Sequence, residues 1–445
     1  MYENMSKQYK ILLILLVLVF GVNIIYSFYF KITPAIDARA YDNIAWNIAQ
    51  SNGYRELADV PFAEDNSIVR VGPGYEFFLA AIYYVFGHNY AAVWVIQALL
   101  LALSAFLIFF VSKEVFGKDW NFLIGIIAAV LVGFSPDLIT LQGMLMSETL
   151  GIFLIILTVY LFFRHINKEN PSISGAVLSS ISLAFTALVR TPAIFLLLSV
   201  IGYYIFRRQW KFLAVFLTVF IILFMPWAIR NYIVFHAFIP TNLAYGLDLA
   251  AGNHPGASGE LEPHEISGQL IEQYGYLKAN SLLLREAVGF IFSHPLEFLK
   301  ITFYRISIYF SFARPTGFWF HLHGLSRALT LASSAFYSAL LFFFGFWGIW
   351  KIKDLKEQKL NAQLLLYMLI MMPLAVIGIV VETRYRSSVY PFFAVFAGYG
   401  INLLWQKKAE WKPIFYIALL FLANTFFDIL RNFGRIIGRI QELIK

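Results

Sequence analysis

The 445-residue sequence contains no cysteine and few charged residues. The absence of cysteine excludes disulfides, thiolate catalysis, cysteine-ligated zinc and iron–sulfur clusters. Charged residues make up 13% of the chain, about half of the roughly 25% that is typical of soluble domains. The sequence also has no GxxxxGK[ST] motif and no GxGxxG motif after a predicted strand, so we expect no nucleotide cofactor.

Hydrophobic residues, in contrast, make up 60% of the chain, and the mean hydropathy is +0.70. The apolar residues are spread over many segments, which indicates a polytopic membrane protein. The first segment, residues 11–30, is long enough to cross a ~30 Å hydrocarbon core. It exceeds the roughly 7–15 apolar residues of a signal peptide, so we expect an uncleaved signal anchor. The net charge of +8 fits basic cytoplasmic loops better than nucleic-acid binding.

The pattern predicts an all-α protein with about 11 (11–13) transmembrane helices and further helices at the outer interface. After the first span, the predicted spans are residues 90–112, 120–135, 146–163, 173–189, 192–206, 212–229, 328–350, 362–381, 387–405 and 412–428. Basic loops near residues 164–168, 207–211, 351–359 and 407–412 should be cytoplasmic, together with the N-terminus. We interpret residues 296–313 as a helix lying at the outer interface.

Two long outer loops, residues 31–89 and 230–327, are predicted within a membrane domain of residues 1–430. A basic amphipathic tail, residues 431–445, follows this domain. Residues 38–52 have apolar residues at helical spacing and precede Gly53, which predicts an amphipathic helix on the membrane surface. After the Gly72-Pro73-Gly74 break, residues 75–87 predict an apolar helix too short to span. Short helices on one face would enclose a chamber for chemistry or transport.

Two carboxylates near the outer ends of spans are candidates for catalysis. Asp37 follows the first span, where it could act as a general base or bind a divalent cation such as Mg²⁺ or Mn²⁺, and Tyr41 lies one turn later. The simpler alternative is that Asp37 caps the following helix. Glu148 lies among apolar residues, where a carboxylate needs a partner or a metal. A salt bridge to an arginine explains Glu148 equally well.

Arginines on the outer face are exceptions to the positive-inside rule and therefore need a partner. Phosphate is the natural one, because a guanidinium binds it bidentately and stays charged when partly desolvated. The alternatives are anionic lipid headgroups and salt bridges to Asp37 or Glu148. The candidates are Arg190, Arg230, Arg384 and Arg386, the last two on either side of Tyr385, and Arg70 before the Gly-Pro-Gly break.

In their order along the chain, these motifs resemble the GT-C glycosyltransferases, in particular the branch of aminoarabinose transferases and protein O-mannosyltransferases. The first outer loop, from Asp37-Ala-Arg-Ala-Tyr41 to Gly53-Tyr54, resembles the first outer loop of that family. The other matching segments cover most of the chain: Arg70 to Tyr75, Ser147-Glu148, Pro226 to Asn231, His294 to Phe298 and Arg384 to Pro391. One departure is that aminoarabinose transferases place a lysine before paired prolines. In this chain the corresponding cation, Arg70, is shifted by one position relative to that lysine.

The resemblance implies a membrane enzyme that transfers a sugar from a polyprenyl-phosphate donor to an acceptor hydroxyl, with inversion at the anomeric carbon. The active site would open on the extracytoplasmic face of a bacterial or archaeal plasma membrane. Asp37 would be the base or, with Glu148, a metal ligand, and loop 230–327 would recognise the acceptor. The resemblance assigns the donor phosphate to Arg384, Tyr385, Arg386, Arg190, Arg230 and Arg70, and sugar or acceptor contacts to Tyr41, Asp42, Tyr75 and Asn231.

Two other functions are compatible with the sequence. A flippase or transporter of lipid-linked sugars would explain the spans and the outer arginines, but not the helix-bearing first loop that begins at Asp37. A metal-independent O-antigen ligase or polymerase would also use a polyprenyl-linked donor and would rely on arginines and histidines of loop 230–327. Asp37 separates these functions, because only the GT-C transferase requires its carboxylate.

Overall fold

The computed structural model describes residues 2–62, 64–69, 72–262, 265–314, 321–355, 357–408, 410–434 and 437. Over these residues the chain is almost entirely helical and contains no strand, apart from one isolated bridge between Glu260 and Val381. The predicted all-α class is therefore confirmed.

Eight of the described helices are long and apolar enough to cross a membrane, some of them together with an adjoining 3-10 turn. These helices are α1 (Tyr2–Phe30), α4 (Tyr90–Phe116), α7 (Ser147–Ile166), α10 (Trp210–Phe235), α14 (Gly324–Trp350), α15 (Lys359–Ile377), α16 (Tyr390–Trp405) and α17 (Trp411–Arg431). Each coincides with a predicted span, because an uninterrupted apolar run of about 20 residues is a reliable signal. Short 3-10 segments beside or between helices include η1 (Asn66–Val69), η2 (Gly117–Asp119), η4 (Lys351–Asp354) and η5 (Thr383–Val389).

The remaining predicted spans are shorter or bent. Helices α5 (Phe122–Gly133) and α6 (Pro136–Gly143) form a pair bent by 46°, which would be a ninth span if it crosses as one unit. Helix α8 (Ile173–Val189) and helix α9 (Leu196–Phe206), which continues from η3 (Thr191–Phe195), are apolar but shorter. The predicted number of about 11 crossings stays a prediction.

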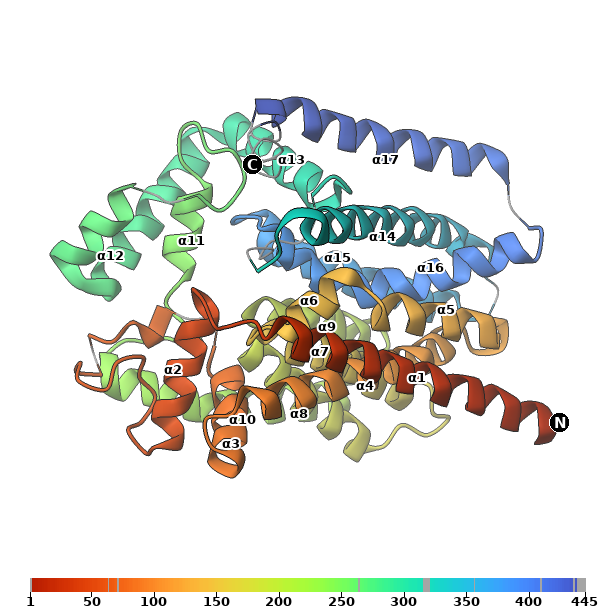
Figure 1. Cartoon of the computed structure of the whole chain (residues 1–445), viewed down its shortest axis with the longest axis horizontal. Coiled ribbons are helices and arrows are strands. Elements are labelled where there is room, and N and C mark those ends of the chain that lie inside the picture. Colours follow the sequence, from red (N-terminus) through yellow and green to blue (C-terminus); the bar gives the residue numbers. More distant parts are fainter. Residues whose placement is uncertain are drawn as a thin grey trace.

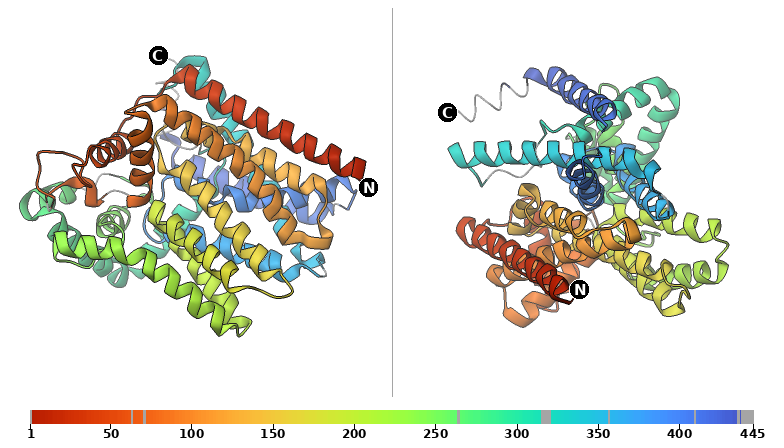
Figure 2. Two further views of the ribbon diagram at one scale, coloured as in Figure 1. Left: turned by 90° about the horizontal axis from the view of Figure 1, so that it is seen from below. Right: turned by 90° about the vertical axis from the view of Figure 1, so that its right-hand side faces the viewer.

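Helices from distant parts of the chain gather at the end of the bundle opposite the N-terminus, which we call the loop end (Figure 1, Figure 2). They are α2 (Asp37–Ala49), α3 (Pro73–Phe86), α11 (Tyr245–Gly252), α12 (Glu265–Ser293) and, beside α12, α13 (Pro295–Phe310). The basic loops predicted to be cytoplasmic lie at the other end, because they join the far ends of α7, α9, α14 and α16. At 16 residues, α13 is not among the helices long enough to span.

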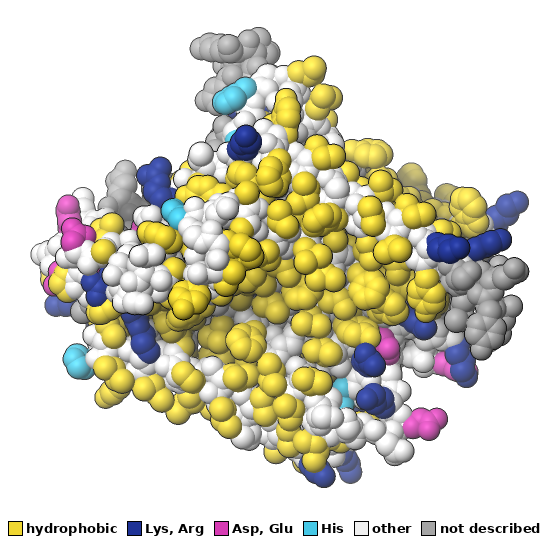
Figure 3. All heavy atoms as spheres, turned by 60° about the horizontal axis from the view of Figure 1, so that its bottom comes forward, with side chains coloured by type: hydrophobic (Ala, Val, Ile, Leu, Met, Phe, Trp, Pro, Cys, Tyr) yellow, Lys and Arg dark blue, Asp and Glu magenta, His cyan; other side chains and the backbone are white. Residues whose placement is uncertain are grey.

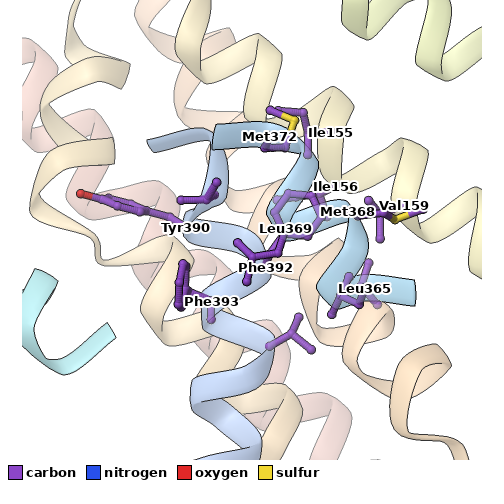
Figure 4. Close-up of a cluster of buried hydrophobic side chains, with 14 of the residues drawn as sticks. Ile155, Ile156, Val159, Leu365, Met368, Leu369, Met372, Tyr390, Phe392 and Phe393 are labelled. Atoms are coloured by element: carbon purple, nitrogen blue, oxygen red, sulfur yellow. The ribbon is translucent and has the colours of Figure 1, made fainter. Parts of the chain in front are cut away.

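The centre of the core lies where α7, α15 and α16 meet, and Figure 4 shows a cluster of its buried hydrophobic side chains. The residues labelled in this view are Ile155, Ile156, Val159, Leu365, Met368, Leu369, Met372, Tyr390, Phe392 and Phe393. The outside is also apolar: Figure 3 shows hydrophobic side chains across the middle of one face, with most Lys and Arg toward its edges. An apolar exterior of this kind is expected where lipid is the solvent.

Helix α2 confirms the predicted amphipathic helix but ends four residues before Gly53. Its apolar face, including Tyr41 and Ala45, packs on Tyr75 and Leu79 of α3. The polar residue Asp42 is buried as well. The apolar face of α2 is therefore covered by protein, because α3 folds back against it after the Gly-Pro-Gly break.

Candidate active site

An ion pair between Asp37 and Arg384 joins the start of α2 to η5, the segment that precedes α16. Oδ2 of Asp37 lies 2.8 Å from Nη2 of Arg384. Nε of Arg384 donates to Oε2 of Glu382 at 2.7 Å. The side chains of Asp37 and Arg384 are 23% and 10% exposed. Arg384 is therefore largely buried, whereas the carboxylate of Asp37 keeps partial exposure.

The start of α2 is strained at this point. The N-cap of the helix is Ile36, which makes no side-chain capping bond, and Asp37 is the first helical residue. The alternative that Asp37 is the N-cap is therefore wrong. Ile36 has φ +52°, a left-handed conformation that β-branched residues rarely adopt. Strain of this kind costs on the order of 1–3 kcal/mol and clusters at functional sites.

Arg386, two residues after Arg384, has a different environment. It is fully buried, and its guanidinium donates to the backbone oxygen of Ser311 at 2.8 Å, to Ser338 at 3.0 Å and to the hydroxyl of Tyr390 at 3.0 Å. Asp137 of α6 lies 3.8 Å from it and accepts a hydrogen bond from Tyr390 at 2.5 Å. The structure thus places Arg386 inside the bundle, where it ties η5 to α6 and α14.

Glu148 and Arg190 form a second ion pair at the loop end. Oε1 of Glu148, at the start of α7, lies 2.9 Å from Nη1 of Arg190, at the end of α8. The same nitrogen donates to the hydroxyl of Ser147 at 3.2 Å. The arginine side chain passes so close to Gly151 that a Cβ there would lie 2.5 Å from Cγ of Arg190. Gly151 is therefore needed for this arrangement.

The Gly-Pro-Gly break positions α8 and hence Arg190. A Cβ on Gly74 would lie 2.6 Å from Cγ2 of Val189, so only glycine lets the start of α3 approach the end of α8 this closely. Arg190 follows Val189 directly. Arg70, the predicted phosphate ligand before this break, lies outside the described residues.

Helix α11 brings an additional carboxylate, Asp248, toward the same ion pairs. Burial raises the pKa of Asp248 to about 6, Arg384 opposes this rise, and the negative charges of Asp37 and Glu382 add to it. Burial likewise raises the pKa of Glu382, against the attraction of Arg384. The sequence analysis does not single out Asp248, because nothing in Gly-Leu-Asp-Leu-Ala distinguishes it from an ordinary loop residue.

Two tyrosines complete the wall around Arg384. Tyr41 is 3% exposed, and burial raises the pKa of its hydroxyl well above the ordinary value; Asp37 adds to this rise and Arg384 opposes it. Tyr41 is therefore a neutral hydrogen-bond donor at any ordinary pH. Tyr385 places its ring beside the guanidinium, 5.4 Å from centroid to Cζ of Arg384, a cation–π distance.

Arg230 and Asn231 lie in a separate cluster of aromatic side chains. Arg230 donates to the backbone oxygen of Tyr54 at 3.1 Å and to Oδ1 of Asn231 at 3.0 Å. Its guanidinium lies 5.1 Å from the ring centroid of Trp227. Asn231 is fully buried and donates to the backbone oxygen of Ile239 at 2.8 Å. These contacts hold the first and second long loops together.

Asp42 and Tyr75 are also occupied by internal hydrogen bonds. Asp42 is buried and accepts hydrogen bonds from Tyr83 at 2.5 Å and from Tyr90 at 2.6 Å. Tyr75 is fully buried and donates to Oε1 of Gln97 at 2.9 Å. Neither side chain makes a described contact with the Asp37–Arg384 pair, although both contribute to packing α2 and α3 against α4.

The carboxylates of the site do not fit a metal centre. Over the part of the chain that the structure describes, no group of three or more His, Cys, Asp or Glu side chains could hold a metal ion. Asp37 and Glu148, the two predicted ligands, each pair with an arginine instead. In each ion pair the guanidinium contacts one oxygen of the carboxylate, Oδ2 of Asp37 or Oε1 of Glu148.

Comparison with known proteins agrees with this architecture. A protein-family model described as dolichyl-phosphate-mannose-protein mannosyltransferase matches residues 70–229, a segment that contains Glu148 and Arg190. A search of curated proteins finds no matching sequence.

Solved structures show the same fold. The apo oligosaccharyltransferase of Archaeoglobus fulgidus matches with a TM-score of 0.52 and 14% identity over 93% of this chain and 55% of its own. The archaeal oligosaccharyltransferase AglB from Archaeoglobus fulgidus was solved in complex with an inhibitory peptide and a dolichol-phosphate. It matches with a TM-score of 0.52 and 13% identity, over 93% of this chain and 54% of its own. ArnT from Cupriavidus metallidurans, bound to undecaprenyl phosphate, has a TM-score of 0.49 and 14% identity, over 88% of this chain and 60% of its own.

The chain thus spans little more than half the length of these structures. At such low identities the likeness concerns the fold, and the family match concerns residues 70–229 alone. Both agree with the resemblance drawn from the motifs. The chain has the fold of these archaeal oligosaccharyltransferases, and its residues 70–229 match the family model of dolichyl-phosphate-mannose-protein mannosyltransferases.

Proposed function

We propose that the protein is a membrane glycosyltransferase that moves a sugar from a polyprenyl-phosphate donor to an acceptor hydroxyl, with the site at the loop end on the extracytoplasmic face. The observation that carries this proposal is the ion pair of Asp37 and Arg384, at 2.8 Å, in which the carboxylate keeps partial exposure. The dolichol-phosphate and undecaprenyl phosphate of the related structures support the choice of donor class.

Asp37 is the proposed base. Its Oδ2 lies against Arg384, which fixes the orientation of the carboxylate and leaves the other oxygen to accept the proton of the acceptor hydroxyl. The acceptor oxygen then bonds to the anomeric carbon as the bond from that carbon to the phosphate oxygen breaks. The polyprenyl phosphate leaves with the electron pair, and a single displacement of this kind inverts the anomeric configuration.

Arg190 is the proposed ligand of the donor phosphate. Among the described residues, Arg190 contacts Glu148 and Ser147, in both cases through Nη1. Its Nε and Nη2 can therefore donate hydrogen bonds to phosphate oxygens. Charge that develops on the leaving phosphate is stabilised by this guanidinium and by Arg384, the kind of interaction that usually contributes most to catalysis. Arg386 and Arg230 would act as structural anchors, since their donors serve the protein itself.

The test is transfer by the purified full-length chain from radiolabelled polyprenyl-phosphate sugars to a crude membrane-lipid acceptor. Wild type should release sugar from the carrier, and Asp37→Asn should reduce the rate by about 10²–10⁴-fold, the range for loss of a general base. EDTA should leave the rate unchanged, because the proposed chemistry uses no metal.

Asp42→Asn provides a matched control, since this carboxylate lies on the same helix but is hydrogen bonded within the protein. Turnover by Asp37→Asn at the wild-type rate would refute the assignment of Asp37 and favour the ligase chemistry. Transport of the intact lipid-linked sugar across proteoliposomes, without its cleavage, would favour the flippase.

A further inference from the structure

Helices α13 and α17 lie side by side at the edge of the bundle (Figure 1). A cavity opens between α13 and the end of α17, and a second cavity opens between α17 and α14, beside the last residue of α13. We call this pair of cavities along α17 the seam. One cavity is polar and lies where α17 ends. The other is apolar and lies about two turns further along α17. None of the residues assigned above to the donor or the base lines either cavity, so the seam requires an explanation of its own.

The polar cavity has a volume of about 430 Å³ and cationic side chains. Lys300 and Tyr304 of α13 face Arg431 and Asn432 of α17, and loop residues 256–258 form the third wall. The guanidinium of Arg431 lies over the ring of Tyr304, at 4.1 Å. Its Nη1 donates to the backbone oxygen of Ser258 at 2.9 Å.

The charges of this cavity are not balanced by ion pairs. Among the described residues, neither Lys300 nor Arg431 has a carboxylate within ion-pair distance, and Nε and Nη2 of Arg431 have no hydrogen-bond partner although protein atoms cover them. Glu297 is the single acidic residue among the lining residues, and its Oε1 accepts a hydrogen bond from the backbone N–H of Gly256 at 3.3 Å. A partner with negative charge and several acceptor oxygens would satisfy both cations.

The apolar cavity has a volume of about 380 Å³. It is lined by Phe310, Phe346, Ile349, Trp350, Ile417, Leu420, Phe421 and Asn424. Asn424 does not make it polar, because its amide donates to the backbone oxygen of Ser307 at 3.1 Å. Leu420 is 71% exposed, so the cavity opens toward the outside of the bundle, where the hydrocarbon of the bilayer would lie.

We propose that this seam binds a membrane lipid with an anionic phosphate headgroup. The phosphate would take the polar cavity, between Lys300 and Arg431, and a hydrocarbon chain would lie in the apolar cavity. One molecule with both properties would fill the two cavities, because α17 borders both of them, the polar one at its end and the apolar one about two turns before it. This site goes beyond the proposed transferase function and does not depend on it.

The test is lipid binding to the delipidated full-length chain in detergent, measured by native mass spectrometry. Phosphatidylglycerol should bind, and phosphatidylcholine with the same acyl chains should bind about tenfold more weakly. The double variant Lys300→Gln/Arg431→Gln should lose about tenfold in affinity for phosphatidylglycerol, the order expected from two interfacial cations. Ile417→Trp should weaken binding of both lipids by filling the apolar cavity.

The matched control is Arg208→Gln/Lys211→Gln, which removes two exposed cations of a basic loop at the other end of the bundle and should leave binding unchanged. Asp37→Asn should also bind normally, which separates this site from the proposed donor site. Equal binding of the two lipids, wild-type affinity in the Lys300/Arg431 variant, or full competition by glycerol 3-phosphate would each overturn the proposal. Lys300→Gln alone, on an exposed side chain, tests the cation without risk to the fold.

Discussion

Two aspartate–arginine pairs use the same short segment, η5, in opposite ways. Arg384 pairs with Asp37 at 2.8 Å, and both side chains keep some exposure. Arg386 lies 3.8 Å from Asp137 with no exposure of either residue, and three further groups accept its hydrogen bonds. Arginines of equal charge, two positions apart, thus have different surroundings. The carboxylate that pairs with Arg384 keeps partial exposure, whereas the carboxylate beside Arg386 has none.

The largest effect on stability should come from breaking the buried pair. Asp137→Asn leaves the guanidinium of Arg386 buried without a counter-charge, which typically costs about 3–5 kcal/mol. We expect a strongly lowered midpoint of thermal unfolding in detergent, followed by tryptophan fluorescence. Asp37→Asn should shift the midpoint far less. Equal shifts for both variants would remove the distinction between the two pairs.

Breaking the accessible pair should affect transfer instead. Arg384→Gln removes the group that orients Asp37 and stabilises charge, so we expect the rate of sugar transfer to fall by about 10²-fold. The unfolding midpoint should stay close to that of wild type. Arg39→Gln is the control, because Arg39 is an exposed arginine on the same helix as Asp37. A rate unchanged in Arg384→Gln would contradict the proposed role.

A steric change can test the position of Arg190 without removing its charge. Gly151→Ala would place a Cβ 2.5 Å from Cγ of Arg190, so the side chain must move away from Glu148. Overpacking of this kind costs about 1–3 kcal/mol, and we expect a KM for the donor that rises more than kcat falls. Gly21→Ala, with open space around its Cβ, should behave as wild type.

The smallest effect concerns the pH dependence of stability. The folded-state pKa of Asp248 is raised to about 6, above the ordinary value of about 3.9, so the folded protein holds this proton more tightly than the unfolded chain. The stabilisation is complete below about pH 4 and is lost as the pH rises through about 6. As the pH rises between these values, the free energy of unfolding of Asp248→Asn should therefore increase by about 1–2 kcal/mol relative to that of wild type. A pH-independent difference in unfolding midpoint would contradict this assignment.

The sequence was sufficient for the helices and for part of the site. The apolar runs located each of the eight helices long and apolar enough to span, but not α12, which the sequence analysis left within loop 230–327. The alternation of apolar and polar residues after Asp37 located α2. Asp37, Glu148, Arg190 and Arg384 stood out because a charged residue beside a span needs a partner. The same argument also selected Arg386 and Arg230. It could not separate them from Arg384 and Arg190, because the charge of a residue and its position beside a span do not indicate how many hydrogen bonds its guanidinium will make within the folded protein.

What the sequence by itself determined is therefore local: which segments are apolar enough to become helices, and which charges stand at their ends. The tertiary structure alone decided which charges meet. Asp37 pairs with Arg384, which lies far from it in the sequence, α11 adds Asp248, and α17 forms one cavity with α13 and the other with α14. The reason is physical: hydropathy acts over one or two helical turns, whereas the pairing of charges depends on how helices distant in sequence pack against one another.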